Sequence, residues 1–501
     1  MPLQKLTVTA EDNGKGAKCL RVKSKGLHSV YSKTIRKTEL RSPLDLSTTF
    51  LMATWFLKSR SVLQCVKTRA GLHQIICNRS LKGASLHSKA LQLEDDLDYS
   101  ENEAWYFPGG AVPFTSKINF IADSSEERIH CYRVLDNSGH HMLSNTSKLI
   151  SKELAVQLYS SMVTLQMMDT VFNEVQRQGR TSFYMTSHGE EAINIASAAA
   201  LSNEDIILPQ YREHGVLLWR GFSLQEFANQ LFANKADKGK GRQMPMHYGS
   251  NKHNYITVSS PLGTQIPQAV GVAYSLKMEK KDACVVTYFG DGTTSEGDFH
   301  AGLNFAAVLE VPVIFFCRNN GWAISTPVTE QFRSDGIAVK GRAYGIPSIR
   351  VDGNDALAIY DAMQEARKIA IKEQKPILIE ALTYRVGHHS TSDDSTKYRA
   401  REEIEQWKAD RNPISRYRNW IEGNGWWNEE QESTLRGSVR KQLMNAIGVA
   451  EKAERPALTD LFADVYHDMP TNLQEQERSL TETIRKHPQD FPSGFAVASQ
   501  I

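Results

Sequence analysis

The chain has 501 residues, of which 41% are apolar and six are cysteines. This length is enough for two or three domains, or for one large α/β domain with extensions. The cysteines are scattered without a CxxC pair, which argues against a disulfide framework or a zinc site and fits a reducing compartment. No stretch of ~18 uninterrupted apolar residues occurs, so we predict no membrane-spanning helix and no membrane partner.

The formal net charge of +2 hides an asymmetry. Residues 1–92 carry 17 Lys and Arg but only 4 Asp and Glu, whereas the rest of the chain is acidic. No basic stripe remains once that segment is set apart, and we therefore expect no nucleic-acid partner.

The basic character continues through a stretch with no acidic residue, from Met52 to Leu93. This stretch holds arginines, five serines and interspersed apolar residues, a composition typical of an organelle transit peptide. A disordered tail is the alternative. We predict that residues 1–92 are a disordered N-terminal extension that includes the transit peptide. Met52 is a natural second start, in which case residues 1–51 are an upstream extension.

Residues 93–150 are predicted to form an extended arm, because an acidic stretch is followed by the aromatic, Pro- and Gly-containing run AWYFPGGAVPF. Helical periodicity begins near Ser151, where apolar residues recur three or four apart. A second helix is expected after Gly189. We expect residues 401–501 to form a helical tail, packed on the domain or on a partner.

Strands and helices alternate in the section between. CVVTYFG (284–290) and VPVIFFC (311–317) are short apolar runs, which suit strands buried on both faces of a parallel sheet. Two further strands are predicted at 348–353 and 376–386, separated by a helix that Asn354 could cap. The alternation predicts an α/β domain over residues 151–400, with a parallel sheet flanked by helices.

Two polar motifs follow neighbouring strands of this predicted sheet. Gly290-Asp291-Gly292 ends the first strand, and Asn319-Asn320 follows the next strand after 26 intervening residues. Each motif alone is more often a turn or a loop. In a parallel sheet, however, both strand ends point to the edge where α/β folds bind ligands. The pair therefore predicts a binding site at that edge.

The chemistry of these motifs suits a metal-bound diphosphate. Asp291 supplies a carboxylate and Asn320 an amide oxygen, which suit Mg²⁺. Backbone N–H groups at the start of the intervening helix can hold phosphates, because the glycines allow a close approach. Arg318 could add positive charge. The arrangement resembles the fingerprint of thiamine-diphosphate enzymes.

The sequences around the motifs make the resemblance specific to one family. The stretches YFGDGTTSEGDFHAGLNFAAVLEVPVIFFCRNNGWAISTP, LPQYREHGVLLWRG, GKGRQMPMHYGS, SSPLGTQIPQAVG and YRVGHHSTSDDS resemble the alpha subunits of branched-chain 2-oxoacid dehydrogenases. The similarity covers about 200–501 and, more loosely, 105–200. The pyruvate dehydrogenase alpha subunit is the alternative, but that family usually lacks the paired histidines and the STSDDS run.

The resemblance implies a thiamine-diphosphate-binding fold and a set of site residues. Mg²⁺ is expected on Asp291, Asn320 and the backbone carbonyl of Trp322. Potassium is expected at Ser259, Pro261, Thr264 and Gln265, although the SPLGT stretch taken alone suggests only a turn. Contacts with thiamine diphosphate are expected from Tyr211, Arg212, Ser260, Leu262, Gly290, Gly292, Thr293, Arg318 and His389.

The loop after the last predicted strand holds Gly387-His388-His389-Ser390. The resemblance makes His389 catalytic, as proton donor to a lipoyl dithiolane, and Ser390 a phosphorylation site. A phosphate there adds nearly two negative charges beside the cofactor site, which we expect to disorder the loop and inactivate the enzyme. The position of a second phosphorylation site in the family is occupied by Ala400.

The implied activity is oxidative decarboxylation of the branched-chain 2-oxoacids of valine, leucine and isoleucine catabolism, with acyl transfer to a lipoyl group in the mitochondrial matrix. A beta subunit is expected in an assembly of two alpha and two beta subunits, because no second α/β block is present for the aminopyrimidine half of the cofactor. The other implied partners are a lipoyl-bearing acyltransferase core, a kinase and a phosphatase. A nicotinamide-dependent dehydrogenase is disfavoured by the missing GxGxxG, and a purely regulatory subunit by the intact Asp291 and Asn320.

Overall fold

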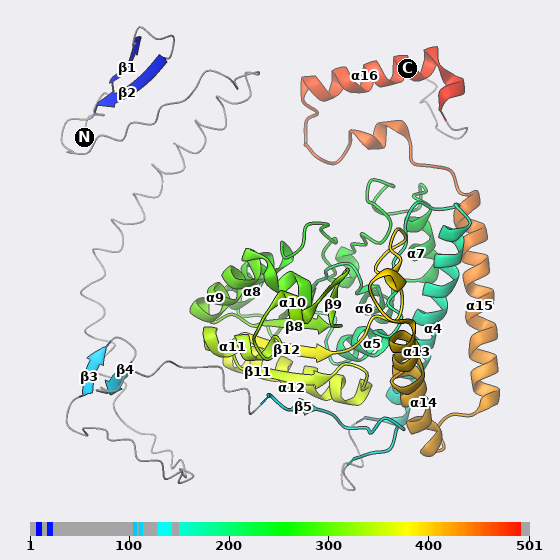
Figure 1. Cartoon of the computed structure of the whole chain (residues 1–501). Coiled ribbons are helices and arrows are strands. Elements are labelled where there is room, and N and C mark those ends of the chain that lie inside the picture. The colour runs from blue at the N-terminus through cyan, green and yellow to red at the C-terminus, as the bar shows by residue number, and fades with distance from the viewer. Residues whose placement is uncertain are drawn as a thin grey trace. The chain divides into compact units, whose positions relative to one another are not determined.

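The computed structural model describes residues 7–12, 18–23, 104–107, 110–113, 128–142 and 150–491 (Figure 1). The chain divides into two units, Met1–Asn119 and Phe120–Ile501. Met52 and the predicted transit segment lie outside the described residues.

Two antiparallel strand pairs are described in the first unit. They are β1 (Thr7–Asp12) with β2 (Lys18–Lys23), and β3 (Ala104–Phe107) with β4 (Gly110–Pro113). The first pair falls inside the range predicted to be disordered, and the alternating residues of TVTAED favour this strand. The second pair falls inside the predicted extended arm.

The second unit is built on a six-stranded sheet with the order β5-β11-β12-β8-β7-β6. Every neighbouring pair in it is parallel, as predicted. The strands are β5 (Cys131–Tyr132), β6 (Ile206–Leu208), β7 (Val285–Gly290), β8 (Val313–Asn319), β11 (Ser348–Asp352) and β12 (Ile377–Leu382).

The central strands bury both faces. In β8, Ile314 and Phe316 pack into one apolar cluster, whereas Val313 and Phe315 pack into another on the opposite face. All four side chains are fully buried. The continuous apolar runs read from the sequence therefore reflect a sheet covered on both sides.

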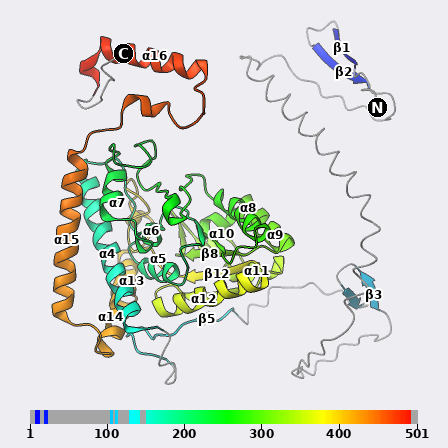
Figure 2. The same cartoon turned by 180° about the vertical axis from the view of Figure 1, so that it is seen from behind.

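Helices form the two covering layers (Figures 1 and 2). One cluster joins the sheet to α4 (Lys152–Arg177), α5 (Glu191–Ala199), α6 (His214–Trp219), α7 (Leu224–Leu231), α12 (Ala356–Glu373), α14 (Pro413–Gly423) and α15 (Glu429–Lys452). The other cluster joins it to α8 (Gln265–Met278), α9 (Gly297–Leu309) and the surroundings of α11 (Ala338–Tyr344). The predicted fold class is confirmed.

The prediction that Asn354 caps α12 is wrong. The N-cap is Asp355, whose carboxylate accepts from the backbone N–H groups of Leu357 and Ala358. Asn354 instead donates from its amide to the carbonyl of Arg411 and accepts from the hydroxyl of Thr383. Both residue types cap helices well, so the sequence alone did not distinguish the two neighbours.

The C-terminal region is helical and contains α13 (Arg401–Asp410) and α16 (Thr471–Lys486) in addition to α14 and α15. Trp407 of α13 stacks on Tyr384, with ring planes 5° apart, and Trp427 packs edge-on against Tyr159 of α4. Helices α13, α14 and α15 are therefore packed on the α/β domain, whereas α16 buries only Ile484. In the described part of the chain, no helix has the length and apolar character that a membrane crossing requires.

One surface of the second unit is conspicuously apolar. It lies on α8 and α9, where Met278, Phe305 and Val308 are 63%, 56% and 74% exposed. Tyr274 of α8 is 43% exposed on the same pair of helices. Exposed apolar side chains on two adjacent helices are typical of surfaces that bind another protein.

Candidate cofactor site

The two polar motifs meet at one edge of the sheet. Gly290, the last residue of β7, is in register with Arg318 near the end of β8. Asp291 opens a short 3-10 helix, η2 (Asp291–Ser295), and Asn320 follows β8 directly. The intervening α-helix α9 begins only at Gly297, so the backbone N–H groups nearest to Asp291 belong to η2.

A cavity of about 340 Å³ opens at this edge. All the residues predicted to contact thiamine diphosphate or Mg²⁺ line it, and so do four that were not predicted. Its full lining is Gln210, Tyr211, Arg212, Ser260, Leu262, Gly290, Asp291, Gly292, Thr293, Arg318, Asn320, Trp322, Ala323, Ile324, Arg385 and His389.

The donor set suits a divalent cation. The Asp291 carboxylate is buried, accepts from the amide of Gln331 at 2.8 Å and forms no ion pair with another described residue. Burial raises its pKa above the usual value, so a cation beside it would stabilise the charged form. Among the described residues, no group of three or more His, Cys, Asp or Glu forms a metal cluster. The candidate set is one carboxylate with amide and carbonyl oxygens, as Mg²⁺ with phosphate accepts.

Asn320 is held in place by a glutamate that the sequence analysis missed. Its amide nitrogen donates to Glu190 at 2.7 Å, and its amide oxygen accepts from the backbone N–H of Trp322 at 3.2 Å. The amide orientation is thereby fixed, with the oxygen on the side of the 320–322 turn.

Arg318 is fully buried between two carboxylates. Its Nη1 lies 2.9 Å from Glu190 and its Nε 2.6 Å from Glu213. Burial disfavours the charged forms, but Arg318 and Arg212 hold the pKa of Glu190 below its usual value. Two ion pairs therefore already partner the Arg318 charge, which we had expected to be directed mainly at phosphates.

Two other arginines have no carboxylate partner among the described residues. Arg212 donates to the carbonyls of Thr186 and His389. Arg385 donates to the carbonyl of Ile324 and shares a hydrogen bond with the hydroxyl of Tyr398. Both are buried and line the cavity, which gives it the positive charge that a diphosphate requires.

His389 lies at the same cavity. Its Nε2 is 3.4 Å from the hydroxyl of Tyr211, and its backbone N–H donates to Asp393 at 2.7 Å. Burial, followed by the charges of Arg212 and Arg385, lowers the pKa of His389 to about 3. The imidazole is therefore neutral near pH 7. His388 does not line the cavity, and its Nδ1 is hydrogen-bonded to the hydroxyl and the backbone N–H of Ser395.

Ser390 sits in a loop that its own residues hold together. Asp393 accepts from the hydroxyl of Tyr398 at 2.6 Å and donates its backbone N–H to the carbonyl of Ser390. Arg399 donates to the carbonyls of Arg385 and Gly387. Arg385 and His389 line the cavity, so the contacts that order the loop also connect it to the cavity.

The predicted potassium residues lie on the segment that precedes α8 and at its start. Thr264 is the N-cap residue of α8, and the side chain of Gln265 donates to the carbonyl of Tyr288 at 3.0 Å. Ser259, Pro261, Thr264 and Gln265 are not part of the cavity lining, although Ser260 and Leu262 between them are.

Gln210 and Glu190 were not predicted as site residues, because the sequence around them gives only weak signals of such a role. Gln210 accepts from the backbone N–H of Gly290 at 2.6 Å and from the hydroxyl of Thr293, and it directly precedes the predicted Tyr211. Glu190 precedes an otherwise apolar helix, where an acidic residue could be dismissed as a solvated helix start. Its burial is a tertiary feature, because Arg318 lies 128 positions away in sequence.

Comparisons with known proteins agree with this geometry. Residues 159–459 match the family model described as the dehydrogenase E1 component. The chain is 57% identical to 2-oxoisovalerate dehydrogenase subunit alpha 1, mitochondrial, of Arabidopsis thaliana, over 89% of this chain and 100% of that protein. It is 50% identical to the human 2-oxoisovalerate dehydrogenase subunit alpha, over 77% and 87% of the two chains, and 52% identical to the Dictyostelium discoideum protein, over 76% and 86%. The chain therefore belongs to the dehydrogenase E1 component family and, within it, to the 2-oxoisovalerate dehydrogenase alpha subunits.

Proposed function

We propose that this chain is the thiamine-diphosphate-binding subunit of a mitochondrial enzyme that oxidatively decarboxylates branched-chain 2-oxoacids and transfers the acyl group to a lipoyl arm. One observation carries the proposal. One cavity at the carboxyl ends of β7 and β8 gathers a carboxylate, an amide oxygen, a neutral histidine and two arginines that form no ion pair with a described residue. The names of its relatives support the branched-chain substrate over pyruvate and a mitochondrial location, which we place in the matrix.

The residues divide the work as follows. Asp291, Asn320 and the carbonyl of Trp322 would hold Mg²⁺, and Arg212, Tyr211 and His389 would contact the diphosphate, with Arg318 behind them. Bound thiamine diphosphate supplies the electron sink for decarboxylation. The protein contributes binding, orientation and exclusion of water.

His389 is the proposed proton donor to the lipoyl dithiolane. Donation uses the imidazolium form, which gives its proton to a dithiolane sulfur, becomes the neutral imidazole and takes up a new proton from solvent. The negative charge of a bound diphosphate would oppose the effect of Arg212 and Arg385, and would move the pKa of His389 back towards neutrality.

A beta subunit is the partner that completes the site. The described part of the second unit has one parallel sheet, which would serve the diphosphate half of the cofactor. The exposed apolar surface of α8 and α9 gives such a subunit a place to pack. The lipoyl group would come from an acyltransferase core.

Two further assignments belong to this proposal. Potassium at Ser259, Pro261, Thr264 and Gln265 would order the segment that carries Ser260 and Leu262. Phosphorylation of Ser390 by a kinase, and its reversal by a phosphatase, would switch the enzyme, because a phosphate would repel Asp393 and release the loop around His389.

The decisive experiment uses the complex reconstituted with its beta subunit. Calorimetry should show saturable binding of thiamine diphosphate in the presence of Mg²⁺, and the Asp291→Asn variant should lose it. A panel of 2-oxoacids that includes pyruvate should give the highest kcat/KM with branched chains. Cofactor binding that is unchanged in Asp291→Asn would refute the site, and a preference for pyruvate would refute the substrate class.

A further inference from the structure

Among the described residues, Gln331 is the one whose side chain donates to the carboxylate of Asp291. It is the last residue of α10 (Val328–Gln331), and its Nε2 lies 2.8 Å from Oδ2 of Asp291. The same nitrogen lies 3.2 Å from the backbone carbonyl of Thr326. An ionised carboxylate and a carbonyl only accept, so both hydrogens of the amide nitrogen are used and the orientation of the amide is fixed.

A short hairpin carries the proposed third metal ligand. It consists of β9 (Trp322–Ala323) and β10 (Thr326–Pro327), which follow β8 and pair antiparallel. The hairpin lies close to η2, since a Cβ added to Gly292 would lie 2.6 Å from the Cβ of Ala323. The amide of Gln331 therefore connects the hairpin, which follows β8, with η2, which follows β7.

The donor on Asp291 is neutral, which leaves the charge of this carboxylate available. At the neighbouring strand end, by contrast, the carboxylates of Glu190 and Glu213 are both paired with Arg318. A glutamine amide orients a carboxylate without cancelling its negative charge. A charged carboxylate with a fixed orientation is a suitable ligand for a divalent cation.

The other end of the same amide shows that Gln331 is not explained by packing. Its Oε1 is buried and has no hydrogen-bond partner in the described part of the chain. A buried oxygen without a partner costs free energy, and a methionine would fill similar space without that cost. The two acceptors that the amide nitrogen holds therefore account for a glutamine at this position.

We propose that Gln331 is a positioning residue of the metal site, which holds Asp291 in the orientation that binds Mg²⁺ and keeps the hairpin against η2. The assignment rests on the proposed function. Gln331 does not line the cofactor cavity, so it would act on the metal through these two contacts. Its loss should lower the affinity for Mg²⁺ and leave the proposed diphosphate contacts of Arg212 and His389 in place.

The test replaces Gln331 by methionine, which has a similar length and volume but no N–H group. Mg²⁺ is titrated by calorimetry into the complex with the beta subunit, in the presence of excess thiamine diphosphate. The dissociation constant for Mg²⁺ should rise by roughly 10–100-fold, the usual effect of losing a residue that supports a metal ligand. Gln331→Ala, a second variant that also lacks the donor, should show the same rise.

A second measurement separates positioning of the metal ligand from a general structural role. The affinity for thiamine diphosphate is measured in saturating Mg²⁺, where mass action fills the weakened metal site. In both variants it should then be close to that of the wild type. A purely structural role predicts a loss of cofactor affinity that excess Mg²⁺ does not repair.

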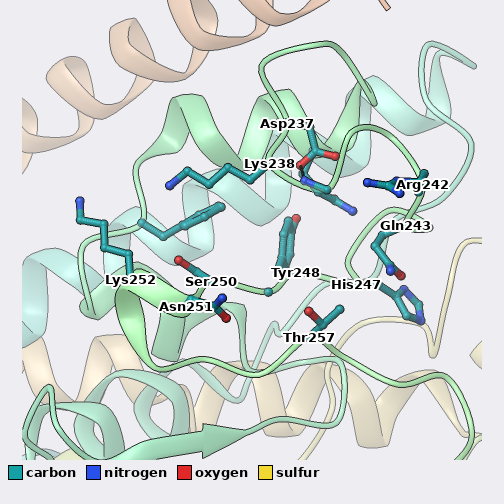
Figure 3. A pocket seen from close by; sticks show the side chains of 14 residues that line it. Asp237, Lys238, Arg242, Gln243, His247, Tyr248, Ser250, Asn251, Lys252 and Thr257 are labelled. Carbon is teal, nitrogen blue, oxygen red and sulfur yellow. Dashed lines mark hydrogen bonds between the residues drawn. The ribbon is translucent and has the colours of Figure 1, made fainter. Parts of the chain in front are cut away.

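Gln243→Met is the matched control. Gln243 is an exposed glutamine that lines a separate cavity of about 480 Å³, which Figure 3 shows, and it does not line the cofactor cavity. This variant should bind Mg²⁺ as the wild type does.

Equal Mg²⁺ affinities in wild type and Gln331→Met, or a cofactor defect that excess Mg²⁺ leaves in place, would overturn the assignment. Failure of the wild type itself to bind Mg²⁺ together with thiamine diphosphate would count against the proposed function instead.

Discussion

The amide nitrogen of Asn320 donates to the buried carboxylate of Glu190 at 2.7 Å, and the same carboxylate pairs with Arg318 at 2.9 Å. One glutamate thus orients a proposed metal ligand and neutralises a guanidinium at the neighbouring strand end. Such supporting contacts fix a ligand's geometry without touching the metal.

Glu190→Gln should weaken binding of the thiamine diphosphate–Mg²⁺ pair by roughly 10–100-fold, because a neutral amide leaves half of the Arg318 charge unpartnered and no longer fixes Asn320. Calorimetry on the complex with the beta subunit measures the effect. Glu204→Gln, an exposed glutamate, is the control. Equal affinities for Glu190→Gln and wild type would contradict the assignment.

Asp355→Ala should lower the free energy of unfolding by about 3 kcal/mol or more. Asp355 caps α12, accepts from the backbone of Val134 and Leu135, and lies 3.4 Å from Arg416. Asn354→Ala should cost only about 1 kcal/mol, because it removes ordinary hydrogen bonds. Urea unfolding of the two variants compares them, and a larger loss for Asn354→Ala would contradict the corrected capping residue.

The lowered pKa of His389 makes a prediction about stability and pH. In the unfolded chain the imidazole takes up a proton near pH 6.5, whereas in the folded chain it does so only near pH 3. Between these values the unfolded state binds more protons, so this contribution to stability is fully present above pH 6.5 and is lost as the pH falls towards 3.

His389→Asn should therefore flatten the decline in unfolding free energy between pH 7 and pH 5 in the cofactor-free chain. Denaturant titrations at several pH values measure this slope, and His467→Asn, at a fully exposed position, should leave it unchanged. A slope that is identical in wild type and His389→Asn would show that His389 titrates normally.

Ser390→Glu should abolish most of the overall activity and increase hydrogen exchange across residues 387–399, because it adds a negative charge to the loop that the Asp393 carboxylate holds through His389 and Tyr398. Ser392→Glu places the same charge two residues away on an exposed side chain and should have little effect. Full activity of Ser390→Glu, or equal exchange in both variants, would argue against the proposed switch. Ala400 is the N-cap residue of α13 and has no hydroxyl to modify, so a single phosphate should suffice.

Val308→Glu should weaken association with the beta subunit, because it places a charge on the exposed apolar surface of α9. Sedimentation velocity measures assembly, and the unfolding free energy of the isolated chain should hardly change at a position that is 74% exposed. Glu310→Gln, at the exposed C-cap of the same helix, is the control. Undisturbed assembly in Val308→Glu would place the interface elsewhere.

The sequence predicted the parts of this molecule that depend on local pattern. The apolar runs predicted β7 and β8, and the helix between them indicated that the two strands are parallel. The polar residues at the strand ends were therefore expected at one edge of the sheet. The contacts to Glu190, Glu213 and Arg385 could not be predicted in this way. The contacts of Glu190 and Glu213 with Arg318 join segments more than a hundred residues apart, and Arg385 reaches Ile324 across 61 residues. Nothing in the local sequence distinguishes a buried, ion-paired glutamate from a solvated one.

The two ion pairs of Arg318 were not predicted for the same reason. Its place beside the Asn pair suggested a phosphate ligand, and the structure gives it two carboxylates as well. The resemblance to a family predicted residues that line one cavity, whereas the arrangement of charge among them became visible only in the fold.

The apolar surface of α8 and α9 has a consequence for the life of the chain inside the cell. A copy synthesised without its partner would leave this apolar surface exposed to other polypeptides, and would aggregate or be bound by chaperones and degraded by proteases. On the proposed packing, synthesis of the two subunits in matched amounts would keep this face covered.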